Sequence, residues 1–352
     1  MGDFLSAIVD AERPSAHRDL IDALKILAST LTMSAATAAP PFAKHLASND
    51  KKTRDKAVKS LATFLSMDER DPIAKSDMDK LWKGIFYCFW MSDKPLVQQA
   101  LAADLAELLL TTSSSTSALS FLSGFWEAIV REWNGIDRLR MDKYYMLVRK
   151  FVNATFRLLA RENWREAACQ TYNKMLTREG GPLCPSDMRV PAGLAYHLAD
   201  IYLEELDKAM ASLDPPPLPA PLSTLLAPFL TLAAQTPTAL TYKRVQSEVF
   251  MPLLDALAAP PQAVDEDDAP PTKKRRLADA SVSDSPLPSK YGSMLANACY
   301  AQPEAGNTPS PRDELREKLL RRIFEVASEP ETKDSSRRKM YALFKQSSGE
   351  EG

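Results

Sequence analysis

Residues 81–91 have the sequence LWKGIFYCFWM, which is apolar almost throughout. A helix with apolar side chains on nearly every face is buried on most of its surface. Burial of Trp82, Phe86, Phe89 and Trp90 would each contribute about 2 kcal/mol. Lys83 does not contradict burial, because its long stem can carry the amino group to water. The run therefore predicts a central core helix.

Helical periodicity continues on both sides of this run, from residue 3 to about residue 214. Apolar residues recur at spacings of three and four, and prolines or capping residues mark the ends of each segment. The expected helices are 17–35, 51–66, 76–91, 95–110, 118–132, 137–161, 164–178 and 191–213. Many helices joined by short turns predict an all-α fold, an irregular helical-repeat array of the HEAT-like α-solenoid type. No clean repeat period is present, so an irregular bundle remains the alternative.

Composition divides the chain into parts. Residues 1–214 are expected to form the helical-repeat domain. Five prolines between residues 215 and 221 make a stiff break. Helices at 222–234 and 238–258 would then continue the array within residues 215–258.

The remainder differs in kind. Residues 259–310 are rich in Pro, Ser, Asp and Ala, which is typical of a disordered linker. Within it, 291–300 is the one segment expected to order, by adding to another surface. Residues 311–352 are expected to form a C-terminal helix, 311–328, and a polar tail with a short helix at 341–344. The helix 311–328 would dock on a partner or fold back on the array.

The overall charge and the cysteines exclude several classes of protein. The net charge is -2 and the pI about 6.1, whereas a protein that coats nucleic acid alone is usually basic. Any RNA contact must therefore use local patches, or partners must supply the charge. The four cysteines are far apart and form no C-x-x-C pair, which indicates reduced thiols without a zinc site or disulfide framework. We see no signal peptide and no apolar run long enough for a membrane helix.

The sequence offers no catalytic constellation. His17, His45 and His197 fall on different expected helices, where a surface or packed role is favoured. The common hydrolase, zinc-protease and P-loop motifs are absent. Glu204 and Glu205 are adjacent, so they do not face each other on a helix, and both are expected to be solvated. We therefore expect a protein that is not an enzyme and uses no cofactor or metal.

Basic residues suggest contact surfaces instead. Lys51, Lys52 and Arg54 begin the expected helix 51–66, which carries further lysines. Such a run is usually solvated surface, but its density leaves binding of phosphate or an acidic partner open. Lys94, in the polar turn after the aromatic run, is a further candidate.

A second basic stretch mixes charges with aromatic residues at a helix–turn–helix corner. Its candidate contact residues are Arg131, Arg138, Arg140, Lys143 and Arg149. The planar guanidinium group of arginine pairs with carboxylate or phosphate. Because acidic residues lie among these arginines, an internal ion-pair network is slightly favoured over direct RNA contact.

The expected linker contains a compact basic cluster, Lys273, Lys274, Arg275 and Arg276, after two prolines. A basic cluster in an extended, accessible segment can be bound by an import receptor. The cluster is interpreted as a nuclear import signal, with ordinary linker composition as the alternative.

Several stretches together resemble the ribosomal RNA-processing protein 1 family. They are FAKHLA (42–47), TRDKAV (53–58), LWKGIFYC (81–88), SDKP (92–95) and residues 131–143. The resemblance implies a helical-repeat factor of the nucleus and nucleolus, present in precursors of the large ribosomal subunit. It would act as a non-catalytic scaffold that supports processing of the internal spacers of precursor rRNA.

The same resemblance implies the partners. These would be other large-subunit assembly factors, the pre-60S particle and, as a further candidate, precursor rRNA, with an import receptor for the basic cluster and no membrane. A nuclear transport adaptor of similar helical architecture is the alternative. The steady location, in the nucleolus or cycling through pores, would separate the two.

Overall fold

The computed structural model describes residues 42–67, 73–112, 114–259, 290–304 and 308–349. All of them belong to one unit of the chain, Phe42–Gly352. The expected helix 17–35 and the basic cluster 273–276 lie outside the described residues.

The described residues form an all-α fold, as the sequence predicted. In chain order, the helices are α3 (Phe42–Leu46), α4 (Lys51–Leu65), α5 (Lys75–Trp90), α6 (Pro95–Thr111), α7 (Ser115–Glu132), α8 (Arg138–Arg161), α9 (Glu166–Thr177), α10 (Ala192–Ala211), α11 (Leu222–Gln235), α12 (Ala239–Val245), α13 (Met251–Ala258), α14 (Gly292–Ala296), α15 (Arg312–Ser328) and α16 (Asp334–Ser348). A 3₁₀ turn, η1 (Trp133–Gly135), precedes α8, and a π-helical turn, η2 (Gln246–Phe250), joins α12 to α13. None of these helices is long and apolar enough to cross a membrane.

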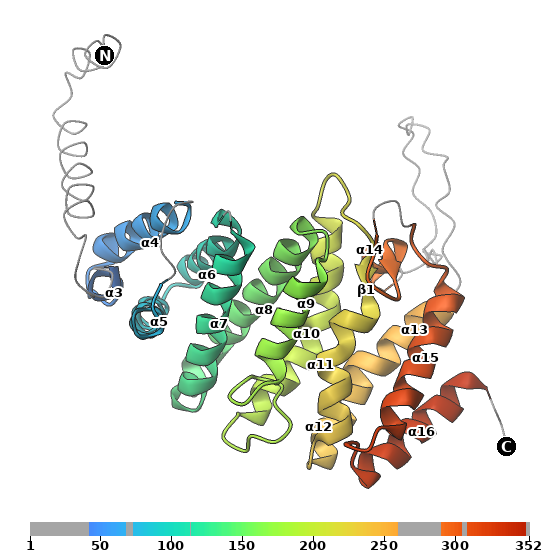
Figure 1. Ribbon diagram of the computed structural model, residues 1–352. Helices are drawn as coiled ribbons and strands as arrows, with labels where there is room; N and C mark the ends of the chain where they lie inside the picture. The colour runs from blue at the N-terminus through green and yellow to red at the C-terminus, as the bar shows by residue number, and fades with distance from the viewer. Residues whose placement is uncertain (1–41, 68–72, 113, 260–289, 305–307, 350–352) are drawn as a thin grey trace, which may run out of the picture. The chain divides into compact units, whose positions relative to one another are not determined.

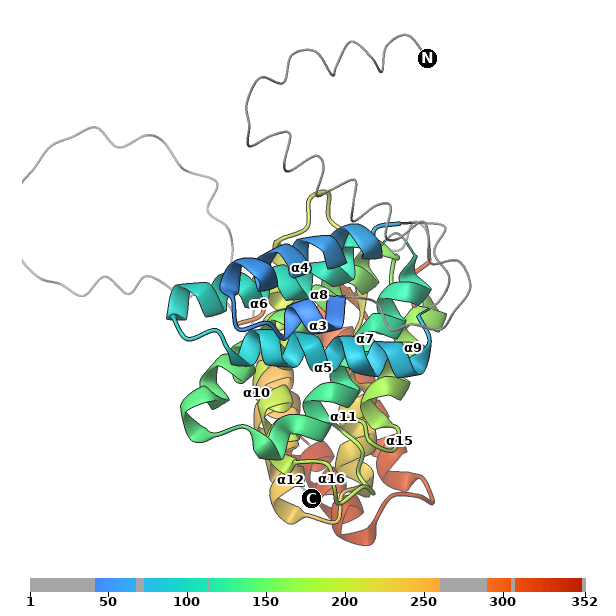
Figure 2. The ribbon, with the colours of Figure 1, turned by 90° about the vertical axis from the view of Figure 1, so that its left-hand side faces the viewer.

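The helices form two layers (Figure 1), in which each helix packs against the next but one along the chain. One layer contains α4, α6, α8, α10 and α12, and the other contains α3, α5, α7, α9 and α11, continued by α15. This alternation is a helical-repeat array of stacked pairs. Figure 2 looks onto one end of it, where α3, α4 and α5 lie in front.

In the first layer, α6, α8, α10 and α12 run in the same direction. Residues near the start of one helix contact residues near the start of its neighbour, and residues further along contact residues further along. The contacts are Lys143–Ser92 and Arg157–Glu107 between α8 and α6, Tyr145–His197 and Arg149–Glu204 between α8 and α10, and Tyr196–Thr241 and Arg244–Asp200 between α10 and α12. The starts of these four helices and the connections that precede them therefore lie along one edge, which we call the N-terminal edge.

The aromatic helix α5 is a core helix, as its composition predicted. Trp82 is buried, and its ring packs against Phe121, Phe125 and Phe151 at centroid distances of 4.5 to 5.7 Å. The indole Nε1 donates to the Phe121 carbonyl at 3.0 Å. Gly124 on α7 makes room for this ring, since a Cβ there would lie 2.3 Å from the indole. The close approach of α5 and α7 thus depends on glycine at this position.

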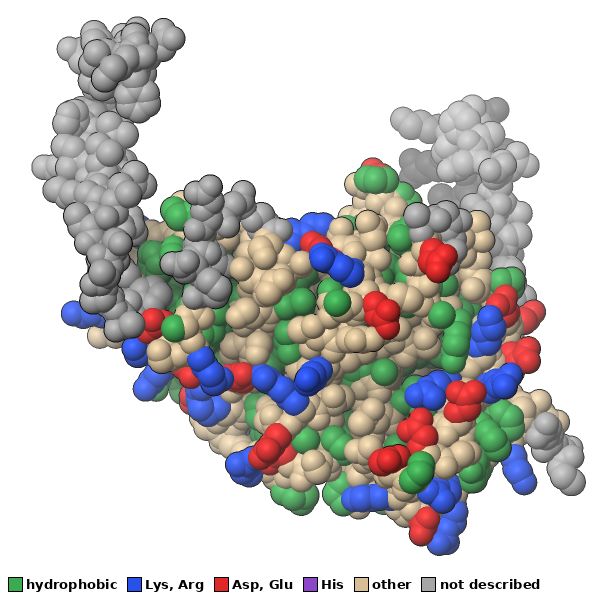
Figure 3. All heavy atoms as spheres, in the orientation of Figure 1, with side chains coloured by type: hydrophobic (Ala, Val, Ile, Leu, Met, Phe, Trp, Pro, Cys, Tyr) green, Lys and Arg blue, Asp and Glu red, His purple; other side chains and the backbone are tan. Residues whose placement is uncertain are grey.

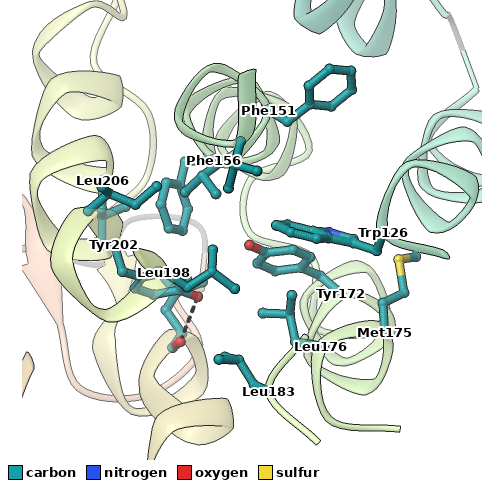
Figure 4. Packing of buried hydrophobic residues seen from close by; sticks show 14 of the residues in the cluster. Trp126, Phe151, Phe156, Tyr172, Met175, Leu176, Leu183, Leu198, Tyr202 and Leu206 are labelled. Carbon is teal, nitrogen blue, oxygen red and sulfur yellow. Dashed lines mark hydrogen bonds between the residues drawn. The ribbon is translucent and has the colours of Figure 1, made fainter. Parts of the chain in front are cut away.

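The core continues through the middle of the array (Figure 4). Trp126 and Tyr172 project from α7 and α9 toward Phe156 on α8 and Tyr202 on α10. The Tyr202 hydroxyl donates to the Leu225 carbonyl of α11 at 2.8 Å. Large aromatic side chains thus join successive helix pairs across both layers.

The C-terminal segments return to the array. Residues 291–300 form α14 and the strand β2 (Ala298–Cys299), which pairs in parallel with β1 (Ala220–Pro221). Helix α15 packs on α11 and α13, so this helix folds back within its own chain. The expected short helix 341–344 is instead the longer α16, whose apolar side packs on α15.

Some helix ends differ from the prediction for identifiable reasons. Helix α8 matches the expected range 137–161, with Asp137 as its cap, accepting from Leu139 N and Arg140 N. Helix α5 begins at Lys75, one residue before the expected start, and its N-cap residue, Ala74, has no capping side chain. The expected helix 238–258 is interrupted by the π-helical turn.

Candidate interaction surfaces

Helix α4 presents a row of lysines to solvent. Asp50 starts the helix by accepting from Thr53 N at 2.9 Å. Beyond this cap, four lysines are exposed, and they make up what we call the α4 basic surface: Lys51, Lys52, Lys56 and Lys59. Of these four, Lys51 pairs with Asp55 of the same helix. Figure 3 shows one face of the molecule, on which basic side chains lie toward both ends of the array.

Arg54, which the sequence grouped with these lysines, turns inward. Its guanidinium group donates to the carbonyls of Ser48 and Asn49 at 2.9 and 3.0 Å, and the residue is buried. These bonds tie the connection after α3 to the first turns of α4. Arg54 therefore contributes to the fold and offers little exposed charge to a partner.

Lys143 also turns inward, at the corner where α8 begins. Its amino group donates to the carbonyls of Phe89, Trp90 and Ser92 at 3.0, 2.7 and 2.8 Å. These carbonyls lie at the end of α5, where helical partners are lacking. Burial lowers the pKa of the Lys143 amino group to about 8, and the nearby Arg140 charge adds to the effect. The lysine thus fastens α8 to the end of α5.

Arg140 lies at the same corner and is partly exposed. It pairs with Asp137, and its guanidinium group lies 4.6 Å from the centre of the Trp90 ring. The hydrogen bond from Arg140 holds the pKa of the Asp137 carboxyl below its usual range. The side chain thus links the cap of α8 to the end of α5, and only part of it faces solvent.

Arg149 joins α8 to α10. It donates to Glu204 and Glu205 at 2.7 Å each. Glu205 is only 3% exposed, which contradicts the expectation that both glutamates are solvated. The correction follows from position, since Glu205 lies between the buried Tyr202 and Ala209 on the packed side of α10. Arg149 thus forms ion pairs between two helices, but with glutamates of α10 and not with the acidic residues near the α8 corner on which the expected network rested.

The remaining candidates are exposed. Arg131 pairs with its neighbour Glu132 at 2.9 Å. Lys94 precedes α6, and Arg138 begins α8. Within the described residues neither Lys94 nor Arg138 forms an ion pair. The structure thus separates the predicted contact residues into a group engaged in the fold and a smaller group left at the surface.

Of the histidines considered for catalysis, His197 is packed, His45 is exposed and His17 lies outside the described residues. His197 Nε2 lies 3.0 Å from the Tyr145 carbonyl, and burial lowers the pKa of this histidine. Burial raises the pKa of Cys88 and Cys299 to about 11, which keeps these thiols protonated and unreactive. In the part of the chain that the structure describes, no group of His, Cys, Asp and Glu side chains could hold a metal ion.

Sequence reasoning missed a groove on the N-terminal edge. Its volume is about 310 Å³, and most of its lining comes from three connections: Asn134 before α8, residues 182–191 before α10 and residues 236–238 before α12. The prolines in these connections were read only as helix ends. Their convergence depends on contacts between distant segments, which local periodicity does not predict.

Comparison with known proteins bears on this arrangement. A family model described as nucleolar protein Nop52 matches residues 37–344. Ribosomal RNA processing protein 1 homolog B of Homo sapiens is 32% identical over 277 residues, which are 78% of this chain and 35% of that protein. Homolog A of Homo sapiens is 30% identical over 328 residues, which are 86% of this chain and 69% of that protein. The chain thus spans about a third of the former relative and about two thirds of the latter.

Proposed function

Because this chain belongs to the Nop52 family of nucleolar proteins, we propose that it is a non-catalytic scaffold of large-ribosomal-subunit assembly. It acts in nucleolar pre-60S particles, where it binds other assembly factors and supports processing of the internal spacers of precursor rRNA. The names of its relatives, which refer to ribosomal RNA processing, support this assignment.

The observation that carries the proposal is the extent of the family match. Residues 37–344 cover the described array except the last turn of α16. The part of the chain that matches the family is thus a two-layer stack of helices, which offers long surfaces along its sides. A protein of this form acts by holding partners in place, so its function depends on the exposed side chains of the array.

Among these surfaces, the α4 basic surface is our candidate for precursor rRNA. Lys52, Lys56 and Lys59 project from one helix and form no ion pair within the described residues. Lysines in this arrangement attract phosphates through a field that salt screens. If these three side chains each neutralise one phosphate of a single strand, the logarithm of the affinity falls with the logarithm of the salt concentration with a slope of about -2.

The test is affinity purification of the tagged full chain at moderate salt, with both RNA and protein identified in the eluate. We expect large-subunit precursor rRNA together with assembly factors. Import receptors or pore proteins without precursor rRNA would contradict the scaffold and favour a transport adaptor. Turnover of RNA by the purified chain would contradict the non-catalytic role.

A further inference from the structure

The most exposed large apolar side chains of the described residues lie on one edge of the array. Leu139, Met188, Leu96 and Leu240 are 93%, 82%, 78% and 59% exposed. Every other exposed large apolar residue described is less than half exposed. A contiguous set of exposed apolar side chains is typical of an interaction site, whereas single ones are ordinary.

Their placement follows from the parallel helices of the first layer. Leu96, Leu139 and Leu240 are each the second residue of their helices, α6, α8 and α12. Met188 lies in the connection that leads into α10, the remaining helix of this layer. The four side chains thus form a row along the N-terminal edge, one for each helix, which we call the aliphatic row.

The groove described above runs along the same edge. Met188 is part of its lining, with Pro182, Pro185 and Pro237 from two connections. In Figure 1 the connections before α10 and α12 lie side by side at the lower end of the array. The apolar row and the shallow, proline-lined groove beside it offer apolar contacts along the path of a segment that crosses the helix starts.

The charges of this edge nearly cancel. The connections 91–96, 132–139, 178–191 and 236–240 contain four cations, Lys94, Arg138, Arg178 and Arg189, and five anions, Asp93, Glu132, Asp137, Glu179 and Asp187. Arg189 pairs with both Asp187 and Glu179, and Arg178 pairs with Glu127 of α7. A polyanion such as RNA is held mainly by cations, and the edge lacks the excess that α4 has. An uncharged, apolar protein segment is the occupant that fits.

We propose that the aliphatic row docks an extended segment of a partner protein, with aliphatic side chains at about every third position. Packed helices lie about 8–10 Å apart, and an extended segment in the polyproline II conformation advances about 3.1 Å per residue with three residues per turn, so that every third side chain faces the same way. Three residues therefore span one helix, and about ten span the row from Leu96 to Leu240. The inference rests on the proposed scaffold function, for which it names a kind of partner and its place on the array.

The test uses the purified full chain and a fluorescein-labelled peptide of twelve residues, with leucine at every third position and serine or glutamine between. The control peptide has the same composition with its leucines in adjacent pairs. We expect saturable anisotropy changes with the spaced peptide and at least tenfold weaker binding of the Leu139→Ser/Leu240→Ser variant. Because both side chains are exposed, this variant keeps its fold.

A control variant, Met67→Ser, removes an exposed apolar side chain that follows α4, away from the edge. It should bind the spaced peptide as the wild type does. Equal binding of both peptides, a loss in the control variant as large as in the edge variant, or no saturable binding by the wild type would each overturn the inference. So would an RNA oligonucleotide whose binding the edge variant abolishes.

A second measurement separates this inference from the proposed function. In purified pre-60S particles, amide hydrogen exchange of residues 91–96, 132–139, 178–191 and 236–240 should be slower than in the free chain. Unchanged exchange in a chain that still associates with particles would overturn the docking edge alone. A chain that never associates with particles but still binds the spaced peptide would overturn the proposed function and leave the edge standing.

Discussion

Helix α4 and the start of α8 are both rich in basic residues, yet their cations differ in whether they face solvent or the interior. On α4, Lys52, Lys56 and Lys59 point to solvent, whereas at the α8 corner Lys143 is buried against three carbonyls. The difference lies in position relative to the packed side of each helix. Lys143 precedes the buried Leu147 by four residues, whereas the three lysines of α4 lie off its packed side.

The same rule accounts for Arg54. It precedes the buried Ala57 and Val58 by three and four residues, which places it on the packed side of α4 among lysines that are not. A cation on the packed side must find acceptors within the chain, and Arg54 finds two. The density of charges alone therefore does not identify a contact surface. The position of each charge relative to the packed side of its helix does.

The largest effect is expected for a substitution in the core around α5. Replacement of Trp82 by Ala leaves a cavity among Phe121, Phe125 and Phe151 and removes the bond to the Phe121 carbonyl. We expect the free energy of unfolding to fall by about 3–5 kcal/mol, as measured by urea denaturation. A thermally unaffected variant would refute the central role of α5.

Replacement of Arg149 by Met should have the next largest effect. It leaves the buried Glu205 with Lys208 as its remaining partner. Breaking a buried ion pair costs about 3–5 kcal/mol. Because Lys208 still pairs with Glu205 and the Arg149 side chain is partly exposed, we expect a loss of about 2 kcal/mol. The matched variant Arg131→Met, at an exposed pair, should cost less than about 1 kcal/mol. Equal losses of stability in the two variants would contradict the distinction between cations packed within the fold and exposed cations.

Lys143→Met keeps the apolar stem and removes the amino group from three carbonyls. We expect a loss of about 1–3 kcal/mol at pH 7, measured by urea denaturation. Lys150→Met, one exposed lysine further along α8, is the matched control and should change stability by less than about 0.5 kcal/mol. A Lys143 variant as stable as its control would show that the corner does not need the amino group.

The contribution of Lys143 should also depend on pH. Its folded pKa of about 8 lies below the value near 10.4 of a free lysine. Between these values the unfolded chain binds a proton that the folded chain does not, so the unfolding free energy of the wild type rises with pH relative to Lys143→Met. Denaturation at a series of pH values from 7 to 10 measures this difference. A constant difference would contradict the lowered pKa.

The smallest effect on stability is expected on α4. Reversing Lys52, Lys56 and Lys59 to Glu should change the unfolding free energy by less than about 0.5 kcal/mol per site, as usual for surface positions. Arg54 is left unchanged, because its reversal would break bonds within the fold. Circular dichroism and thermal denaturation check that helicity survives. Unfolding of this variant would show that these lysines are structural.

Much of the fold could be predicted from sequence because each helix carries its own signals. Pro95 starts α6, Asp137 caps α8, and Gly180, with a φ of +75°, follows α9. The aromatic run of α5 likewise predicts that this helix is buried. These are local effects that depend on residues within a turn or two of one another.

The interaction surfaces were harder to predict, because they depend on contacts between distant segments. Glu205 was expected in solvent, yet Arg149, 56 residues away, holds it in the interior. The aliphatic row exists only because four helices run parallel, and no spacing within one helix reveals that. The burial of Lys143 and Arg54, in contrast, could have been read from their register.

The most direct test of the scaffold is sedimentation of the tagged full chain from nuclear extract through a sucrose gradient. Three forms would be compared: wild type, the α4 variant Lys52→Glu/Lys56→Glu/Lys59→Glu, and the matched variant Lys150→Glu/Lys174→Glu/Lys345→Glu, which reverses exposed lysines on three other helices. The account predicts that wild type and matched variant travel with large-subunit precursors while the α4 variant shifts to lighter fractions. Sedimentation of the wild type alone near the top of the gradient would contradict it.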